Sequence, residues 1–222
     1  SAILPLLAIS LCITAAAQTR YSRSDQSGIA YEEINPVRRD DFSHVLEISI
    51  KENRTIRVLS SEGKGIRSWE TEYGDAGKIV SETHFEEGRK TEVSRYALNG
   101  RLETTETFRD ERLFEVTQFE YQGGLLTLST VMDPDGKTLW TDRYRYGANG
   151  KLALHERKNA DGTAMTSFFD HYGGKPVRIW TGSGSSGTLE TYYPSGAMAE
   201  RESYDGDSLL SKDTWRYENP DG

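Results

Sequence analysis

The chain has 222 residues, of which 35% are hydrophobic and 28% are charged, and its formal net charge at pH 7 is −8. These values are typical of folded proteins and fit one elongated domain or two small ones. The acidic balance excludes nucleic acid as the expected partner, because neutralising phosphates requires clustered lysine and arginine. The basic pair Arg38 and Arg39 is followed at once by Asp40 and Asp41, which predicts a solvated loop.

Residues 1–17 form an uncharged, mostly apolar run that ends in three alanines before Gln18. This pattern is typical of a secretory signal peptide with a small-residue cleavage site, so we expect the exported chain to begin near Gln18. The run is shorter than the roughly 20 apolar residues of a membrane helix. We therefore expect a periplasmic or cell-surface protein with no transmembrane segment once the signal is removed.

Cys12 is the only cysteine, and it lies inside this apolar run. We expect it to be removed with the signal peptide. A lipid anchor at Cys12 is the alternative, although Leu11 differs from the small residue that normally precedes a lipid-modified cysteine. Without Cys12 the exported chain has no disulfide, thiolate nucleophile or cysteine metal ligand.

Residues 18–68 do not follow the pattern of the rest of the chain. The polar segment from Gln18 to Asp41 predicts loops, whereas 44–50 and 55–59 are rich in Val, Ile and Leu and predict one or two strands. We expect this region to cap the first edge of a repeat array, which would otherwise expose unpaired backbone groups.

From residue 69 to 222 the chain repeats a unit of about 24 residues. Residues 218–222 stop where a further strand is expected, so we expect the array to be truncated at its C-terminus. The marker of the unit is a series of tyrosines spaced 21 to 26 residues apart: Tyr73, Tyr96, Tyr121, Tyr146, Tyr172, Tyr193 and Tyr217.

Within a unit, large apolar residues are separated by six positions, as Ile79 and Phe85 are. An even separation places both side chains on one face of a strand, and the helical period of 3.6 fits none of these segments. We predict that these residues and the tyrosines form the repeat core, together with Leu152. The same step of six joins Leu102 to Phe108, Leu126 to Met132 and Met198 to Tyr204.

Turn signals separate the expected strands, because Asn and Asp tolerate positive φ and Gly adopts it without a steric cost. Each repeat therefore predicts a two-stranded hairpin, which is marginal alone and is stabilised by its neighbours. The predicted fold class is all-β, an elongated array of antiparallel β-hairpin repeats in a single twisted or wound sheet. The turn signals lie at 75–77, 98–100, 133–136, 148–150, 160–162 and 204–206.

The repeats resemble two kinds of bacterial repeat. The pattern Tyr-x-x-x-Gly-(Lys/Arg)-(Ile/Leu), at 73–79, 96–102 and 146–152, is similar to the tyrosine-aspartate repeats of Rhs-type cell-surface proteins. The segment from Tyr192 to Gly206 is similar to the MORN-variant repeats of antitoxins from toxin–antitoxin systems. These resemblances cover roughly 150 residues of the chain and imply a β-repeat fold. They imply no catalytic residue.

No segment carries a convincing catalytic, cofactor or metal motif. The Gly-rich stretch 182–187 satisfies G-x-G-x-x-G, but it precedes an expected strand rather than a helix, which predicts a flexible turn. Residues 133–136 resemble the start of a calcium loop without its later ligands. The four histidines, His44, His84, His155 and His171, lack metal-ligand spacing. We therefore predict no catalytic residue, no metal and no cofactor.

The sequence favours an exported, non-enzymatic repeat protein that serves as a scaffold or binding surface for a protein or cell-envelope polymer. An antitoxin-like or immunity-like protein that neutralises a partner toxin is the alternative. An enzyme with its site in 18–68 is a third hypothesis. The tryptophans are expected to pack inward, with an exposed platform for sugars or peptides as the alternative; they are Trp69, Trp140, Trp180 and Trp215.

Overall fold

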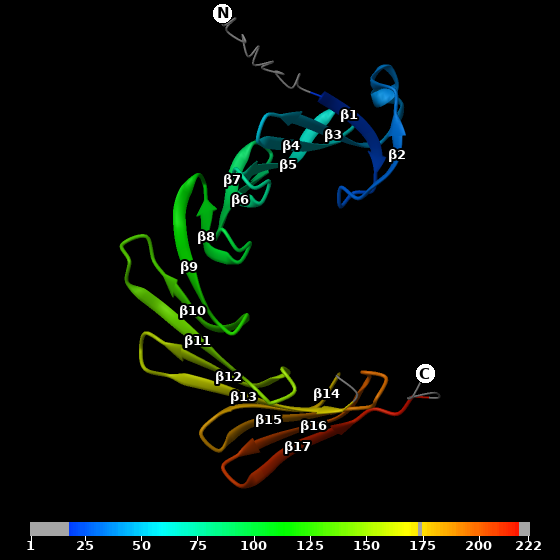
Figure 1. Ribbon diagram of the computed structural model, residues 1–222. Helices are drawn as coiled ribbons and strands as arrows, with labels where there is room; N and C mark the ends of the chain where they lie inside the picture. The colour runs from blue at the N-terminus through cyan, green and yellow to red at the C-terminus, as the bar shows by residue number, and fades with distance from the viewer. Residues whose placement is uncertain (1–17, 173–174, 218–222) are drawn as a thin grey trace, which may run out of the picture. The chain divides into compact units, whose positions relative to one another are not determined.

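The computed structural model describes residues 18–172 and 175–217. This part of the chain contains seventeen β-strands and one short 3-10 helix, and every described strand pair is antiparallel (Figure 1). The strands form two compact units, which divide between Arg101 and Leu102. The expected signal peptide, Cys12 and the expected C-terminal truncation lie outside the described residues. None of the described helices is long or apolar enough to cross a membrane.

In the first unit the strand order is β2, β1, β3, β4, β5, β6, β7, so only β1 departs from the order of the chain. The helix η1 joins β2 to β3. The elements are β1 (Gln18–Ser24), β2 (Ala30–Ile34), η1 (Pro36–Asp41), β3 (His44–Lys51), β4 (Arg54–Ser61), β5 (Lys64–Tyr73), β6 (Ile79–Glu86) and β7 (Arg89–Tyr96).

In the second unit each strand pairs with the next one in the chain. The predicted all-β array of antiparallel hairpins is confirmed, in an open sheet. The elements are β8 (Leu102–Arg109), β9 (Arg112–Gln122), β10 (Leu125–Met132), β11 (Thr138–Tyr146), β12 (Leu152–Asn159), β13 (Ala164–Tyr172), β14 (Lys175–Ser183), β15 (Ser186–Tyr192), β16 (Met198–Asp205) and β17 (Ser208–Thr214).

The repeat length is visible in the first strand of each hairpin. From Ile79 onward these strands begin 23 residues apart, except for 27 residues between Leu125 and Leu152. The longer unit contains two turns of the wider kind, at 133–137 and 147–151, whereas each of the other described units contains at most one. A wider turn uses more residues than the two-residue turns elsewhere, so the extra length lies in loops while the strands keep their size.

The wider turn is one recurring structure. At 97–101 the N–H of Ala97 donates to the carbonyl of Arg101, and the N–H of Gly100 donates back to the carbonyl of Ala97, both at 2.8 Å. Gly100 has φ of +82°, a conformation that glycine adopts at no steric cost. Five of the six predicted turn signals form this turn, and the sixth, at 204–206, contributes to a two-residue turn between β16 and β17. The same pair of bonds closes the turns at 25–29, 74–78, 133–137, 147–151, 159–163 and 193–197.

The prediction of loops from Gln18 to Asp41 is wrong, because this segment forms β1, β2 and η1. Its strands carry polar side chains on both faces, so the hydrophobic alternation that signals a strand is missing. Cross-strand polar pairs take its place. The hydroxyl oxygen of Thr19 lies 3.1 Å from that of Ser49, and Arg23 forms an ion pair with Glu32 at 3.0 Å.

The main apolar core lies in the first unit. Leu46 and Leu59 lie opposite each other on β3 and β4, and Leu59 is fully buried. The turn between β1 and β2 covers this pair, because a Cβ atom at Gly28 would lie 3.2 Å from the ring of Trp69 and 3.7 Å from Leu59. Val45, the neighbour of Leu46 in β3, is buried on the opposite face. The first unit thus has buried apolar residues on both faces of its sheet.

Candidate functional site

The carboxylate of Asp142 is a buried charged group in the second unit. Asp142 on β11 lies opposite Arg157 on β12, and only 3% of its surface is exposed. Its Oδ1 accepts a hydrogen bond from Arg157 Nε at 2.8 Å, and its Oδ2 accepts one from Nη2 at 3.0 Å. Nε2 of His155 lies 2.7 Å from the same Oδ1. The carboxylate is therefore held by two neighbours on the next strand.

Aromatic rings complete this group of side chains. The guanidinium of Arg157 lies 5.4 Å from the centroid of the Trp140 ring, within the range of a cation–π contact. The ring of Tyr144 stacks on His155 with centroids 5.0 Å apart and an angle of 10° between the planes. Trp140, Asp142 and Tyr144 alternate along β11, so all three project from one face of the sheet.

The pKa of Asp142 reflects two opposing effects. Burial of the carboxylate raises its pKa, but the hydrogen bonds and electrostatic interactions with Arg157 and His155 outweigh burial. The net result is a lowered pKa. The carboxylate is thus ionised at neutral pH, and its chemistry is that of a structural anion rather than of a proton donor.

A second group of the same composition lies between β15 and β16. Glu190 lies opposite Arg201, whose Nη2 donates to Oε1 of Glu190 at 2.7 Å. The Tyr192 hydroxyl donates to the other carboxylate oxygen at 2.7 Å, and Arg201 lies 6.0 Å from the centroid of Trp215. Burial, followed by this carboxylate, raises the pKa of Tyr192 to about 12. The hydrogen bond from Tyr192 is the main cause of the lowered pKa of Glu190.

The two groups project from the same face of the second unit. In antiparallel strands, residues that lie opposite each other share a face. His155 lies opposite Ser167, and Ser167 opposite Thr181. The row continues from Thr181 to Thr188 on β15, and Thr188 is two positions before Glu190. We call this side of the second unit the cluster face.

The first unit contains a related group. Arg57 lies opposite Trp69, with its guanidinium 5.5 Å from the ring centroid, and 3.8 Å from a carboxylate oxygen of Glu82. The Tyr96 hydroxyl donates to the other oxygen of Glu82 at 2.8 Å. Burial and this hydrogen bond raise the pKa of Tyr96 to about 12. The combination of arginine, tryptophan and carboxylate therefore occurs in three places, which we call the Arg–Trp–acid clusters.

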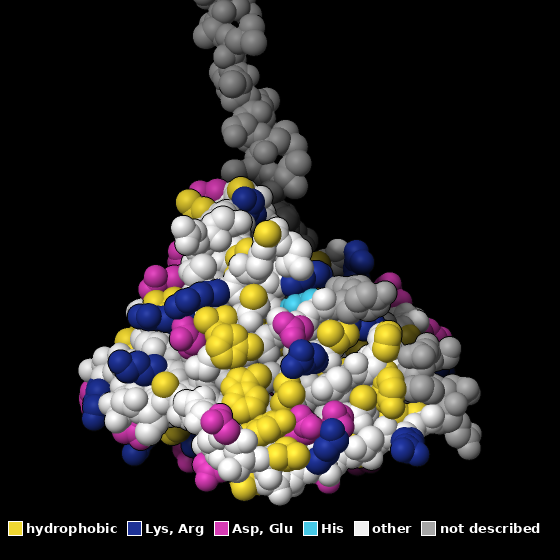
Figure 2. Space-filling model, turned by 90° about the horizontal axis from the view of Figure 1, so that it is seen from below, with side chains coloured by type: hydrophobic (Ala, Val, Ile, Leu, Met, Phe, Trp, Pro, Cys, Tyr) yellow, Lys and Arg dark blue, Asp and Glu magenta, His cyan; other side chains and the backbone are white. Residues whose placement is uncertain are grey.

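The opposite face of the second unit carries an apolar row. Leu154, Phe168, Trp180 and Leu189 lie opposite one another on β12 to β15. A Cβ atom at Gly187 would lie 2.9 Å from the Trp180 ring, so the indole packs directly against glycine backbone. Figure 2 shows hydrophobic side chains gathered among acidic and basic groups on the surface seen from below.

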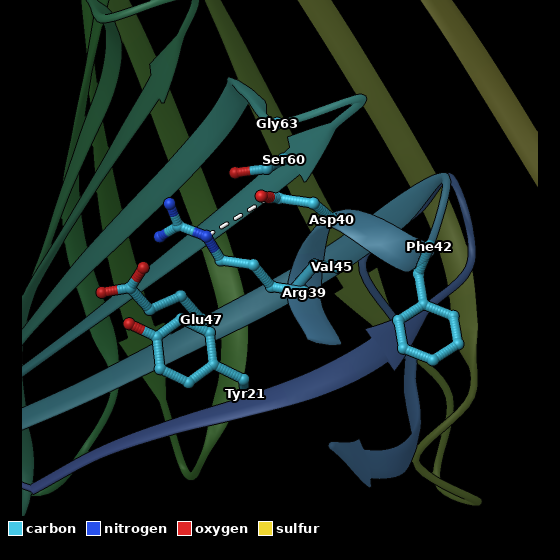
Figure 3. Close-up of a pocket in the computed structure, with 8 residues that line it drawn as sticks. All are labelled: Tyr21, Arg39, Asp40, Phe42, Val45, Glu47, Ser60 and Gly63. Atoms are coloured by element: carbon cyan, nitrogen blue, oxygen red, sulfur yellow. Dashed lines mark ion pairs between the residues drawn. The ribbon is translucent and has the colours of Figure 1, made fainter. Parts of the chain in front are cut away.

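A pocket of about 200 Å³ lies in the first unit where η1 approaches β1, β3 and the turn between β4 and β5 (Figure 3). The side chain of Asn35 caps η1 by accepting a hydrogen bond from the Val37 N–H at 3.0 Å. This cap starts the helix that carries two of the lining residues. The pocket is lined by Tyr21, Arg39, Asp40, Phe42, Val45, Glu47, Ser60 and Gly63.

The residues predicted to form the repeat core lie along the strands and in the turns. Tyr217 is exposed, and the side chain of Tyr172 lies outside the described residues. The buried residues of the second unit are Ser129, Val131, Asp142 and Ser167. The other predicted core residues are half-buried: Tyr73, Ile79, Phe85, Tyr96, Leu102, Phe108, Tyr121, Leu126, Met132, Tyr146, Leu152, Tyr193, Met198 and Tyr204.

Sequence reasoning missed the charged members of the Arg–Trp–acid clusters. In the two clusters of the second unit the signal is a carboxylate two positions from an aromatic residue in the same strand, as in Asp142 between Trp140 and Tyr144. The Gly-rich stretch 182–187 forms the turn and strand ends between β14 and β15. Within residues 18–172 and 175–217, no group of three or more His, Cys, Asp or Glu side chains is placed to hold a metal ion.

No protein-family model matches this sequence, and no curated protein matches it. Among solved structures, the chain is similar to TcdB2-TccC3-Cdc42, with 11% identity over 90% of this chain and a TM-score of 0.27. It is similar to a GtfA/B complex bound to UDP and GlcNAc, with 16% identity over 60% of this chain and a TM-score of 0.18.

A third similar structure is the Photorhabdus luminescens Tc holotoxin pore with a mutation in TccC3, at 9% identity over 84% of this chain and a TM-score of 0.18. The chain spans 15%, 23% and 16% of the length of these three chains. At these scores the similarities assign neither a family nor a partner.

Proposed function

We propose that this protein is an exported, non-enzymatic scaffold that binds a protein or a cell-envelope polymer along its hairpin sheet. The observation that carries the proposal is the recurrence of the Arg–Trp–acid cluster. The arginine side chains in these clusters, Arg57, Arg157 and Arg201, are 40%, 40% and 44% exposed although each lies on a tryptophan ring. Each cluster thus presents the same chemical group to solvent.

Such a group is suited to binding because it is ordered before a partner arrives. The carboxylate and the indole ring hold the guanidinium in place, so little side-chain entropy is lost on association. The guanidinium and indole also combine a polar edge with an apolar face, and arginine and tryptophan are enriched where interfaces gain most of their affinity.

The charge of each cluster indicates what kind of partner fits. The acid neutralises the arginine, so the cluster offers no excess positive charge to a phosphate backbone. A protein surface or a glycan polymer, which mixes apolar and hydrogen-bonding groups, matches this chemistry. Export is supported by the pattern of residues 1–17, and the resemblance to bacterial surface repeats agrees with a repeat scaffold.

The test uses the full chain, cross-linked in an envelope fraction of the organism that makes it, and sedimented separately with purified peptidoglycan. For a ligand captured in either arm, affinity is compared between Arg157→Gln, Arg201→Gln and two control variants. The controls are Arg145→Gln and Arg178→Gln, which change exposed arginines on the opposite face of the second unit.

We expect each variant on the cluster face to weaken binding about tenfold, corresponding to the loss of about 1.4 kcal/mol. The controls are expected to leave binding unchanged. Equal weakening by the control variants, or no ligand in either arm, contradicts the proposal.

A further inference from the structure

The pocket beside η1 combines opposite charges within a small volume. Figure 3 shows the Arg39 side chain from η1 extending between Asp40 of the same helix and Glu47 from β3, with Tyr21 from β1 beside Glu47. The hydroxyl-bearing Ser60 of β4 lies near Arg39 and Asp40. These residues come from four separate elements, so the fold rather than the local sequence brings them together.

The guanidinium of Arg39 pairs with Asp40 through one of its three nitrogens. Its Nε lies 3.3 Å from Oδ1 of Asp40. In Figure 3 the two terminal nitrogens point away from Asp40 and into the space beside Glu47. A planar guanidinium with two adjacent free N–H edges matches the geometry of a carboxylate. The hydroxyl of Ser60 adds a further donor on the same side of the pocket.

The other side of the pocket accepts a cation. The carboxylate of Glu47 and the hydroxyl of Tyr21 lie next to each other in Figure 3. Val45, which is buried, contributes an apolar side chain to the lining of the pocket. The pocket therefore has an anion-binding end, a cation-binding end and an apolar part.

We propose that this pocket binds a free α-amino acid. The carboxylate of the ligand would accept hydrogen bonds from the Arg39 terminal nitrogens and from Ser60. Its ammonium group would donate to Glu47, with the Tyr21 hydroxyl beside it. Ligand pockets for larger molecules usually measure about 300–1,000 Å³, so a pocket of about 200 Å³ fits a molecule the size of an amino acid.

This site is separate from the Arg–Trp–acid clusters, so the amino-acid pocket and the scaffold function stand or fall independently. The test measures binding of the common L-amino acids to the full chain by calorimetry and ligand-observed NMR at neutral pH. For each amino acid that binds, the N-acetyl and the amide derivatives are tested, because each lacks one of the two charges. We expect saturable binding of at least one amino acid and loss of binding for both derivatives.

Variants identify the site. Arg39→Gln and Glu47→Gln are each expected to weaken binding at least about tenfold, as loss of a hydrogen bond to a charged group does. Arg38→Gln is the matched control, because Arg38 lies on the same helix, pairs with Asp41 at 3.0 Å and does not line the pocket. If one variant fails to fold, the other variant and the two derivatives still decide the question. Absence of binding by all amino acids, retention of binding by either derivative, or equal weakening by Arg38→Gln overturns the proposal.

Discussion

Asp142 and Arg157 face each other across β11 and β12, and the guanidinium donates two hydrogen bonds to the two carboxylate oxygens. This pairing places an almost fully buried charge in the sheet. Among the described residues of the second unit, Val131 is the only buried apolar residue. The polar contact between Asp142 and Arg157 thus occupies a buried cross-strand position that is apolar in most sheets.

Asp142→Asn is expected to destabilise the protein. The amide cannot form the charge-assisted pair with Arg157, and hydrogen bonds to charged groups contribute about 1.5–3 kcal/mol. We expect the free energy of unfolding in urea to fall by about 1–3 kcal/mol. Asp170→Asn is the control, because Asp170 pairs with Arg178 at 3.7 Å and its side chain is 69% exposed. Exposed pairs contribute about 0–1 kcal/mol, so a control effect as large as that of Asp142→Asn would refute the prediction.

The same carboxylate makes stability depend on pH. The pKa of Asp142 is lowered in the folded chain, so its contribution is complete above the ordinary pKa of an unfolded aspartate, about 3.9. That contribution is lost as the pH falls through the lowered folded pKa. Unfolding free energies measured at neutral pH and below about pH 3 should therefore show the gap between wild type and Asp142→Asn closing in acid. A gap of constant size at both values would show that the charge of Asp142 is not the cause.

Gly187→Ala is expected to destabilise the hairpin of β14 and β15. The new Cβ atom would lie 2.5 Å from the carbonyl oxygen of Thr181 and 2.9 Å from the Trp180 ring. Overpacking of this kind typically costs about 1–3 kcal/mol. Gly65→Ala is the matched control in a strand, since its Cβ would meet only Val58 at 3.5 Å. Thermal unfolding of the two variants checks the prediction, which fails if Gly65→Ala is the less stable of the two.

Alanine substitutions at two turn glycines test whether the turn between β1 and β2 covers Leu59. Gly28 and Gly100 occupy the same position in the same kind of turn, with φ of +85° and +82°. Alanine at either position costs about 1–2 kcal/mol for the left-handed conformation. At Gly28 the Cβ would also lie 3.2 Å from Trp69, whereas at Gly100 it meets nothing within 4 Å. We expect Gly28→Ala to lower the melting temperature more than Gly100→Ala, and equal losses would mean that the turn does not cover the core.

The hairpins and their turns could be predicted from the sequence because both depend on local chemistry. Gly100 follows Asn99 in a turn that requires positive φ, and a glycine with positive φ occupies the same position wherever the wider turn occurs. The strands β1 and β2 could not be predicted, because β1 is defined by pairing with β3, and β2 by pairing with β1, rather than by hydrophobic alternation.

The Arg–Trp–acid clusters were missed for a related reason. Glu190 and Arg201 are 11 residues apart in the chain, and only the register of β15 and β16 places them opposite each other. A one-residue shift of that register would send the two side chains to different faces. The pocket beside η1 depends on the packing of a short helix against three strands, which no periodicity in the sequence encodes.

The central claim is that a partner binds to the face of the second unit that carries the Arg–Trp–acid clusters. Oxidative footprinting of the tryptophans, with and without the captured ligand, tests it directly. Trp140 and Trp215 belong to clusters on that face, while Trp180 lies on the opposite face and serves as an internal control. We predict that the ligand protects Trp140 and Trp215 and leaves Trp180 reactive. Protection of Trp180 without protection of the other two rings would contradict the account.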